Sequence, residues 1–352
     1  MAKRENLIIT RVKENILNNN LIENNDSIVV GLSGGPDSVF LIEVLQGLKK
    51  EFKEKYNINY NMVVCHINHM IRKEAGNDES LAKEYAEKYG FEFYSLKADV
   101  KKIAKEKKIS EEECGREIRY DFFNKIAKEH GCNKIAVAHN SCDNAETMLH
   151  NLMRGSGLNG LAGIKVKNKN IIRPILDVSK AEIIDYLEKE NIKYNIDKTN
   201  NENIYTRNKI RNDLIPKIQK EYNPNIINSL NRMSKQIQED LEYINSSAKE
   251  KYKKALLEKN DKYLKINIKD FSNEYKAIKS RIILLFIDDF VGETKGIENA
   301  HIESVCNMFE KGITGKRFSI GNKFDIVIEK GKIAKIIKND VKKWKLKILW
   351  TT

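Results

Sequence analysis

The sequence contains few cysteines and no long hydrophobic run, and each shortage excludes a class of protein. No apolar run approaches the length of a membrane span, and the N-terminus lacks the continuous apolar core of a secretory signal. We therefore expect a cytoplasmic protein without a membrane anchor. The cysteines are odd in number and form no C-x-x-C pair, which indicates a reducing compartment and argues against structural zinc or a metal cluster. They are Cys65, Cys114, Cys132, Cys142 and Cys306.

Length and charge suggest several domains and a polyanionic partner. A chain of 352 residues predicts two or three domains. The formal net charge of +13 favours a nucleic-acid partner, although a lysine-rich genome would produce a similar excess. Residues 311–352 carry 12 lysines and arginines against three acidic residues. This segment either contacts a polyanion or forms a solvated edge, because lysine also protects edge strands from aggregation.

The most informative stretch is an apolar strand followed by a glycine-rich turn and a helix. The strand is predicted at Ile28–Leu32, the turn at Ser33–Ser38, and the helix follows at once. This arrangement directs backbone N–H groups at an anion, typically phosphate. The turn has neither the G-K-[ST] lysine nor G-x-G-x-x-G spacing, so it is neither a Walker loop nor a dinucleotide fingerprint. An ordinary glycine-rich connection is the alternative.

Four further apolar runs alternate with predicted helices, as in an α/β protein with a parallel sheet. The strands are predicted at 61–67, 91–96, 134–138 and 171–176, and the helices at 7–19, 78–89, 111–123 and 178–192. In the second half, Asn223 and Pro224 form a helix start, and a long amphipathic helix follows. Further helices are expected at 274–290 and 298–311, and alternating apolar residues after 316 predict hairpins.

Several polar clusters lie just after predicted strands, where open α/β sheets bind ligands. Asp143 and Glu146 are three residues apart on a helix, so both carboxylates face one way and suit a Mg²⁺ ion beside phosphates. His66 and His69 follow the second strand; zinc would need more ligands than this spacing offers, and a structural role is the alternative. The glycines in residues 155–163 suggest a loop that covers a substrate or closes like a lid.

These motifs carry a resemblance to a known family. The turn SGGPDS resembles the pyrophosphate loop of the ATP-pyrophosphatase superfamily. The strings HINHMIR, GREIRY and AHNSCDNAETML, together with the RGSGLNGL run, resemble those of tRNA(Ile)-lysidine synthetases over residues 28–216. Residues 197–216 also resemble a D-x-S-N…RN-x-[IL]-R pattern in that family. The chain departs from the family at Asn140, Asn144 and Cys142, and Cys142 replaces the first of two acids. Gly115 stands where the family commonly has alanine.

The resemblance implies roles for individual residues and a fold. The N-terminal domain, residues 1–216, would be a parallel-sheet, adenine-nucleotide α-hydrolase-like (Rossmann-like) catalytic domain. A helical substrate- and tRNA-binding domain (217–296) and a basic α+β region (297–352) that binds tRNA would follow. Implied catalytic residues are Asp37, Arg116, Asp143 and Glu146, and the implied metal ligands are Asp37, Asp143 and Glu146. Implied ATP-binding residues are Ser33, Gly34, Gly35, Pro36, Asp37, Ser38, His66, Arg72 and His139. Implied tRNA-binding residues are Arg154, Arg173, Arg207 and Arg211.

The implied reaction uses ATP and Mg²⁺ to join free L-lysine to C2 of the wobble cytidine in the CAU anticodon of tRNA(Ile). Three alternatives remain open. A tRNA thiolase on the same fold would normally need a reactive cysteine pair, and a glutamine-dependent synthetase would need an amidotransferase domain. A non-catalytic ATP-sensing RNA-binding module is the third. We include a second copy of this chain, in a homodimer, among the expected partners. We expect no membrane partner.

Overall fold

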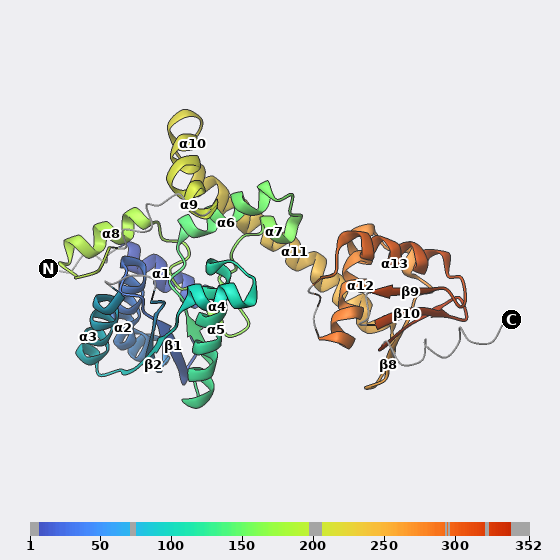
Figure 1. The fold of residues 1–352 in the computed structure, drawn as a ribbon, viewed down its shortest axis with the longest axis horizontal. Helices are drawn as coiled ribbons and strands as arrows, with labels where there is room; N and C mark the ends of the chain where they lie inside the picture. The colour runs from blue at the N-terminus through green and yellow to red at the C-terminus, as the bar shows by residue number, and fades with distance from the viewer. Residues whose placement is uncertain are drawn as a thin grey trace. The chain divides into compact units, whose positions relative to one another are not determined.

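The computed structural model describes residues 7–70, 75–196, 206–292, 294, 296–320 and 324–338, which form two compact units that divide between Ile237 and Gln238 (Figure 1). The first unit alternates helices and strands over most of its length. Its elements are α1 (Leu7–Asn18), β1 (Asp26–Gly31), α2 (Pro36–Tyr56), β2 (Tyr60–Asn68), α3 (Ala75–Tyr89), β3 (Glu92–Lys97), α4 (Val100–Lys107), α5 (Glu111–Glu129), β4 (Lys134–Ala136), α6 (Ser141–Met153), α7 (Leu158–Leu161), β5 (Lys167–Asn168), β6 (Ile171–Ile172), α8 (Lys180–Lys189), α9 (Thr206–Lys209), the π-helical turn η2 (Ile210–Leu214) and α10 (Ile215–Glu221).

The strands of the first unit form one sheet in the order β3-β2-β1-β4-β6-β5. All neighbouring pairs are parallel except β5 and β6, which are antiparallel. The central strand β1 aligns Val29 with Val63 on one side and with Ile135 on the other. The prediction of a parallel α/β core is therefore confirmed.

Alternate residues of β1 enter two different hydrophobic cores, because successive side chains of a strand point to opposite faces. Ile28 and Val30 pack in a cluster with residues of α1, α2, α3 and α8. Val29 packs on the other face, with Phe122 and Phe123 of α5. Covering on both faces explains why the strand is an unbroken apolar run rather than an alternating one.

The prediction of a strand at residues 171–176 is wrong beyond Ile172. Only Ile171 and Ile172 pair in the sheet, as β6. The backbone N–H of Arg173 instead donates to the Val166 carbonyl, and Pro174 has no N–H to extend the ladder. The chain therefore turns away from the sheet before the apolar run ends.

In its described residues, the second unit contains an antiparallel sheet in the order β7-β8-β11-β10-β9 and three α-helices. Its core joins Leu264, Ile326 and Ile336 of the strands to Ile283 and Phe286 of α12. The predicted period-two hairpin is confirmed by the antiparallel pairing of β10 with β11. The elements are the later part of α11 (Ile226–Ala255), β7 (Leu256–Lys259), β8 (Tyr263–Asn267), the 3-10 turn η3 (Phe271–Asn273), α12 (Lys276–Val291), α13 (Asn299–Lys311), β9 (Arg317–Ile320), β10 (Phe324–Glu329) and β11 (Ile333–Lys338).

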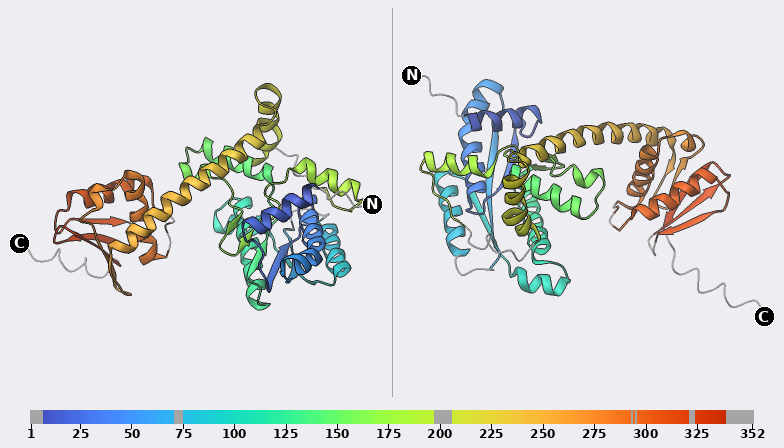
Figure 2. Two further views of the ribbon diagram at one scale, coloured as in Figure 1. Left: turned by 180° about the vertical axis from the view of Figure 1, so that it is seen from behind. Right: turned by 90° about the horizontal axis from the view of Figure 1, so that it is seen from above.

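The domain division differs from the predicted boundaries after residues 216 and 296. The units divide within α11, which is one continuous helix of 30 residues (Figure 2). The region predicted to be helical also contains β7 and β8, which belong to the C-terminal sheet. Because α12 shares a core with β10 and β11, residues on both sides of position 296 fold together. None of the helices in the described ranges is long and apolar enough to cross a membrane.

Candidate active site

A cleft of about 820 Å³ opens at the carboxyl ends of the central parallel strands. Residues directly after β1, β2 and β4 line it, including Ser33, His69 and His139. Helices α2, α3, α5, α6 and α8 and the segment from α9 to the start of α11 supply the remaining walls. This is the edge of an open α/β sheet at which ligands bind.

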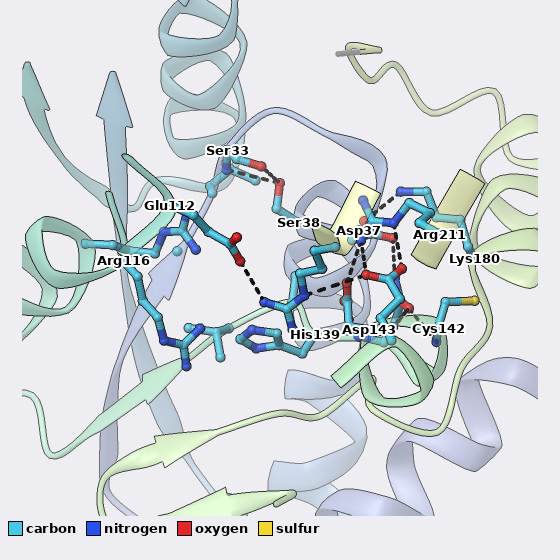
Figure 3. Close-up of a pocket in the computed structure, with 18 of the residues that line it drawn as sticks. Ser33, Asp37, Ser38, Glu112, Arg116, His139, Cys142, Asp143, Lys180 and Arg211 are labelled. Atoms are coloured by element: carbon cyan, nitrogen blue, oxygen red, sulfur yellow. Dashed lines mark hydrogen bonds and ion pairs between the residues drawn. The ribbon is translucent and has the colours of Figure 1, made fainter. Parts of the chain in front are cut away.

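The phosphate turn is held by a network of serine hydrogen bonds (Figure 3). The backbone N–H of Ser33 donates to the Ser38 hydroxyl (3.1 Å), which itself donates to the Gly35 carbonyl (2.9 Å). Gly34 has a φ of +84°, and a Cβ there would lie 3.3 Å from Asp78. Ser33, Asp37 and Ser38 line the cleft, whereas Gly34, Gly35 and Pro36 shape the turn without lining it. The turn therefore leads directly into the N-terminus of α2, the end of a helix that favours an anion.

Three carboxylates meet on one side of the cleft, each with a cationic partner. Asp37, the second residue of α2, accepts a 2.6 Å hydrogen bond from Lys180, the first residue of α8. Asp143 and Glu146 on α6 both accept from Arg211, at 3.1 Å and at 2.6 and 2.9 Å. The predicted acids are thus brought together, and two cations from distant parts of the chain pair with them.

Burial controls the protonation of the two α6 acids. The Glu146 side chain is 1% exposed, and its burial raises the pKa of the carboxyl, which the hydrogen bonds from Arg211 oppose without cancelling. Burial also raises the pKa of Asp143, and the hydrogen bond from the backbone of Asn140 opposes that shift. Buried carboxylates of this kind need a cation close by to stay ionised.

The arginines predicted to bind tRNA have different surroundings. Arg207 donates to Glu112 (3.1 Å) and Thr147 (2.6 Å), so it joins α9 to α5 and α6, and like Arg211 it lines the cleft. Arg154 is exposed at the C-terminal cap of α6 and remains a candidate for RNA contact.

The structure does not support an RNA contact by Arg173. Its side chain donates to the Lys165 carbonyl (2.7 Å) and to Nδ1 of His139 (3.3 Å), and the residue is only 4% exposed. An arginine whose donors are used inside the fold orients its neighbours instead. Sequence alone could not distinguish this role, because it depends on where β6 ends.

Two histidines of the cleft, His69 and His139, are neutral groups. Burial, reinforced by Arg173, lowers the pKa of His139 to about 3; because its Nδ1 accepts from Arg173, its proton lies on Nε2. Burial and the nearby Arg119 lower the pKa of His69 to about 4. His66 is 2% exposed, its Nδ1 is 2.8 Å from the Leu32 carbonyl, and its Nε2 has no hydrogen-bond partner among the described residues.

Two arginines come from the α5 wall, apart from the acids. Figure 3 shows Arg116 well separated from Asp37 and Asp143, and Arg119 also lines the cleft. The Arg116 guanidinium lies 4.9 Å from the centre of the Tyr120 ring. Burial lowers the pKa of Arg119. Positive charge thus faces the acids across the space that a ligand would occupy.

Two residues that line the cleft, Lys180 and Glu112, escaped the sequence prediction. Asn140, His69 and Arg119 line it as well; they belong to the sequence motifs but were not assigned a role. A usable signal existed for Lys180, since Ser179 and Glu182 form a capping box that fixes the start of α8 beside the same edge of the sheet. The predicted residues Arg72, Asp197, Thr199 and Asn200 lie outside the described residues.

The glycine-rich loop does not cover the cleft in this structure. None of residues 154–164 lines it. The loop is instead bonded to its own helix and to α11: Asn144 accepts from the Ile164 N–H (2.6 Å), and Ser234 donates to the Ala162 carbonyl (2.7 Å). At Gly163, whose φ is +65°, a Cβ would lie 2.2 Å from the Asn144 oxygen, which explains the glycine.

The acids suit a cation that arrives with its substrate better than a resident metal. Within the described ranges, no three His, Cys, Asp or Glu side chains form a group that could hold a metal ion by themselves. Magnesium, however, is commonly bound through one or two carboxylates and substrate phosphates rather than by a protein cage. The oxygen donors of Asp37, Asp143 and Glu146 beside the phosphate turn fit that mode.

Comparison with known proteins agrees with this geometry. Residues 6–218 match the family model of the PP-loop domain, so the fold and cleft are those of a PP-loop protein. The tRNA(Ile)-lysidine synthase of Clostridium tetani is 44% identical over 89% of this chain and 66% of its own length. That of Clostridium acetobutylicum is 40% identical over 95% of this chain and 71% of its own length. The chain belongs to the tRNA(Ile)-lysidine synthase family.

The family prediction, and with it membership of a family of enzymes, is therefore confirmed. The chain spans about two thirds of the length of these relatives. Among solved structures, the U34-tRNA thiolase of Methanococcus maripaludis matches with a TM-score of 0.53 at 22% identity, over 66% of this chain and 78% of that one. At this identity the likeness supports the fold alone and says nothing about the reaction.

Proposed function

We propose that this chain catalyses the ATP-dependent addition of lysine to C2 of the wobble cytidine in the CAU anticodon of an isoleucine tRNA. The cytidine O2 attacks the α-phosphorus of ATP and pyrophosphate leaves. The ε-amine of free lysine then attacks C2, and AMP leaves. The observation that carries the proposal is the cleft, in which a phosphate turn faces the α6 acids in a member of this family.

The residues of the cleft take different roles according to their charge. The N–H groups at the start of α2 and the Ser33 hydroxyl bind the leaving pyrophosphate. Arg116 and Arg119, on the α5 wall, stabilise the negative charge that develops at the phosphorus under attack. His139, which is neutral, offers its Nε2 proton as a hydrogen-bond donor to the nucleotide rather than a charge.

Magnesium enters this scheme with the nucleotide. Asp37, Asp143 and Glu146 would hold it, and when bound it neutralises the charge of the phosphate oxygens. Before the nucleotide binds, Lys180 and Arg211 keep these acids compensated. We expect both cations to exchange carboxylate partners for phosphate oxygens when ATP occupies the cleft.

The RNA must present one base to the cleft. A cytidine in an anticodon loop can leave its stack at a cost of a few kcal/mol, less than a base in a duplex. The second unit, which carries exposed lysines at positions 316, 330 and 332, and Arg154 of the first unit would contact the tRNA backbone. A homodimer and a cytoplasmic location remain predictions.

The test is transfer of labelled lysine to tRNA. The protein is incubated with ATP, Mg²⁺, labelled lysine and a transcript of isoleucine tRNA with a CAU anticodon. We expect lysine to enter this transcript but not a matched transcript with uridine at the wobble position. Transfer to both transcripts, or no transfer by protein that binds ATP and tRNA, would contradict the proposal. Incorporation of sulfur instead would favour the thiolase alternative.

A further inference from the structure

Asn140, between β4 and α6, bonds both to the acid of the phosphate turn and to the first acid of α6. Its Nδ2 donates to Oδ1 of Asp37 (3.1 Å), and its backbone N–H donates to Oδ2 of Asp143 (3.0 Å). Its Oδ1 accepts from the backbone N–H groups of Cys142 (2.9 Å) and Asp143 (3.2 Å), which caps α6. The residue is 3% exposed.

The hydrogen-bond partners fix the orientation of this amide. Two backbone donors face its oxygen and a carboxylate oxygen faces its nitrogen. The flipped amide would place oxygen against the carboxylate of Asp37 and NH₂ against the N–H of Cys142, so that its contacts would be unsatisfied. Asn140 therefore presents a donor to Asp37 and an acceptor to the helix.

The two acids that Asn140 contacts belong to helices that enter the cleft from different strands. Asp37 is near the start of α2, and Asp143 is in the first turn of α6. The two negative charges repel each other in a partly buried cleft. The second carboxylate oxygen of Asp37 already bonds to Lys180, and that of Asp143 bonds to Arg211. A neutral group that binds both acids holds them together without competing with a cation for charge.

We infer that Asn140 is a positioning residue that sets the separation of Asp37 and Asp143, so that both acids meet the magnesium carried by ATP. This inference rests on the proposed function. The family pattern that this segment resembles has a histidine at this position, where this chain has an amide. An imidazole N–H can also donate to Asp37, but histidine is a poor helix cap.

The two tasks of Asn140, capping and donation, can be separated by substitution. Asn140→Ser keeps a capping oxygen but is too short to reach Asp37, whereas Asn140→His keeps an N–H donor and loses the cap. The measurements are thermal unfolding and the dissociation constant of a non-hydrolysable α,β-methylene ATP, each with and without Mg²⁺.

We expect Asn140→Ser to weaken binding about tenfold with Mg²⁺ and less than about twofold without it, because a hydrogen bond to a charged group is lost. Its Tm should match that of the wild type. Asn140→His should have a lower Tm but retain more of the Mg²⁺-dependent affinity than Asn140→Ser does.

Asp99→Ala is the matched control. Asp99 caps α4, away from the cleft, by accepting from the Lys102 N–H at 3.0 Å. It should lower the Tm and leave nucleotide affinity unchanged. The inference is overturned if Asn140→Ser binds as the wild type does, or if affinity follows Tm across the four proteins. Wild-type protein without Mg²⁺-dependent binding would instead overturn the proposed function.

Discussion

In the first unit, charged side chains of the cleft are joined across long stretches of sequence, whereas in the second unit many are paired on the surface. Lys180 reaches Asp37 across 143 residues, and Arg211 bonds to Glu146, whose side chain is 1% exposed. In the second unit, Lys276 and Glu303 form a pair whose side chains are 79% and 61% exposed. Exposed pairs contribute little free energy, while a buried acid depends on its partner. The same substitution should therefore have very different effects in the two units.

The largest expected effect is at Asp37. Asp37→Asn keeps the shape of the phosphate turn but removes the charge that meets Lys180 and the nucleotide's cation. We expect tRNA-dependent ATP–pyrophosphate exchange to fall by at least about 1,000-fold with the fold intact. The matched control is Glu303→Gln, which breaks a lysine–carboxylate pair in the second unit and should leave exchange unchanged. Near-normal exchange in folded Asp37→Asn would remove this residue from the mechanism.

Substitutions at two neighbouring residues of α6 should differ sharply in their effect on lysine transfer. Asp143→Asn should reduce lysine transfer by about 100-fold, because the carboxylate is shared with Arg211 in the cleft. Cys142→Ser should retain transfer, since burial raises the pKa of this thiol and a neutral sulfur is a poor partner for Mg²⁺. Transfer assays on the two variants decide the matter. An inactive Cys142→Ser beside an active Asp143→Asn would mean that the metal site has been misassigned.

Removal of Arg211 should destabilise the protein in a pH-dependent way. Arg211→Gln leaves Glu146 buried without its closest cation, and we expect a loss of about 2 kcal/mol in the free energy of unfolding at pH 7.5. Lys276→Gln, its counterpart in the second unit, should change the free energy by less than about 0.5 kcal/mol.

The direction of this pH dependence follows from the raised pKa of Glu146. Folding favours the protonated form of this acid, and loss of Arg211 raises its folded pKa further. The loss of stability in Arg211→Gln is therefore complete at a pH above the folded-state pKa of Glu146 in the variant. It shrinks as the pH falls toward 4.5, the ordinary pKa of glutamate, because Glu146 is then protonated and no longer needs the cation. Urea unfolding at pH 7.5 and pH 5 measures it. A deficit that grows as pH falls would contradict this account of the pair.

A smaller effect is expected from the exposed lysines of the second unit. Deletion of residues 311–352 is unsuitable, because it would remove Phe324, Ile326 and Ile336 from the core. We instead expect a triple replacement of Lys316, Lys330 and Lys332 by glutamine to weaken tRNA binding about three- to tenfold and to leave ATP binding unchanged. The affinity of the wild type for tRNA should also fall as salt rises. An unchanged tRNA affinity in the variant would show that these lysines are only a solvated edge.

The smallest effect is expected at Gly115 in α5. An added Cβ would lie 3.6 Å from the His69 ring, an ordinary contact, and the residue is within a helix. Gly115→Ala should therefore raise the free energy of unfolding by up to about 1 kcal/mol. A decrease would show that α5 and His69 are packed more tightly than the backbone indicates.

The sequence predicted those parts of the molecule that depend on local pattern. The strand around Val29, the phosphate turn and the acids of α6 all follow from short motifs, and the structure has the strand and turn as expected. The bonds from Lys180 and Asn140 to Asp37 could not be predicted in this way, because Asp37 is more than 100 residues distant, although the capping box at Ser179 already indicates that Lys180 opens a helix. Strand β7 was missed because it is exposed throughout and lacks a buried alternation. Strand β8 does alternate, with Leu264 and Ile266 buried, but its five residues lie in a region that was predicted to be helical.

The most direct test of the account is the fate of ATP labelled at the α- and γ-phosphates. We expect the wild-type protein, given Mg²⁺, lysine and tRNA with a CAU anticodon, to convert ATP to AMP and pyrophosphate in a one-to-one ratio with the lysine transferred. Asp37→Asn should produce neither product above background, and Glu303→Gln should match the wild type. Release of ADP and phosphate instead would contradict the assignment of the cleft to cleavage between the α- and β-phosphates.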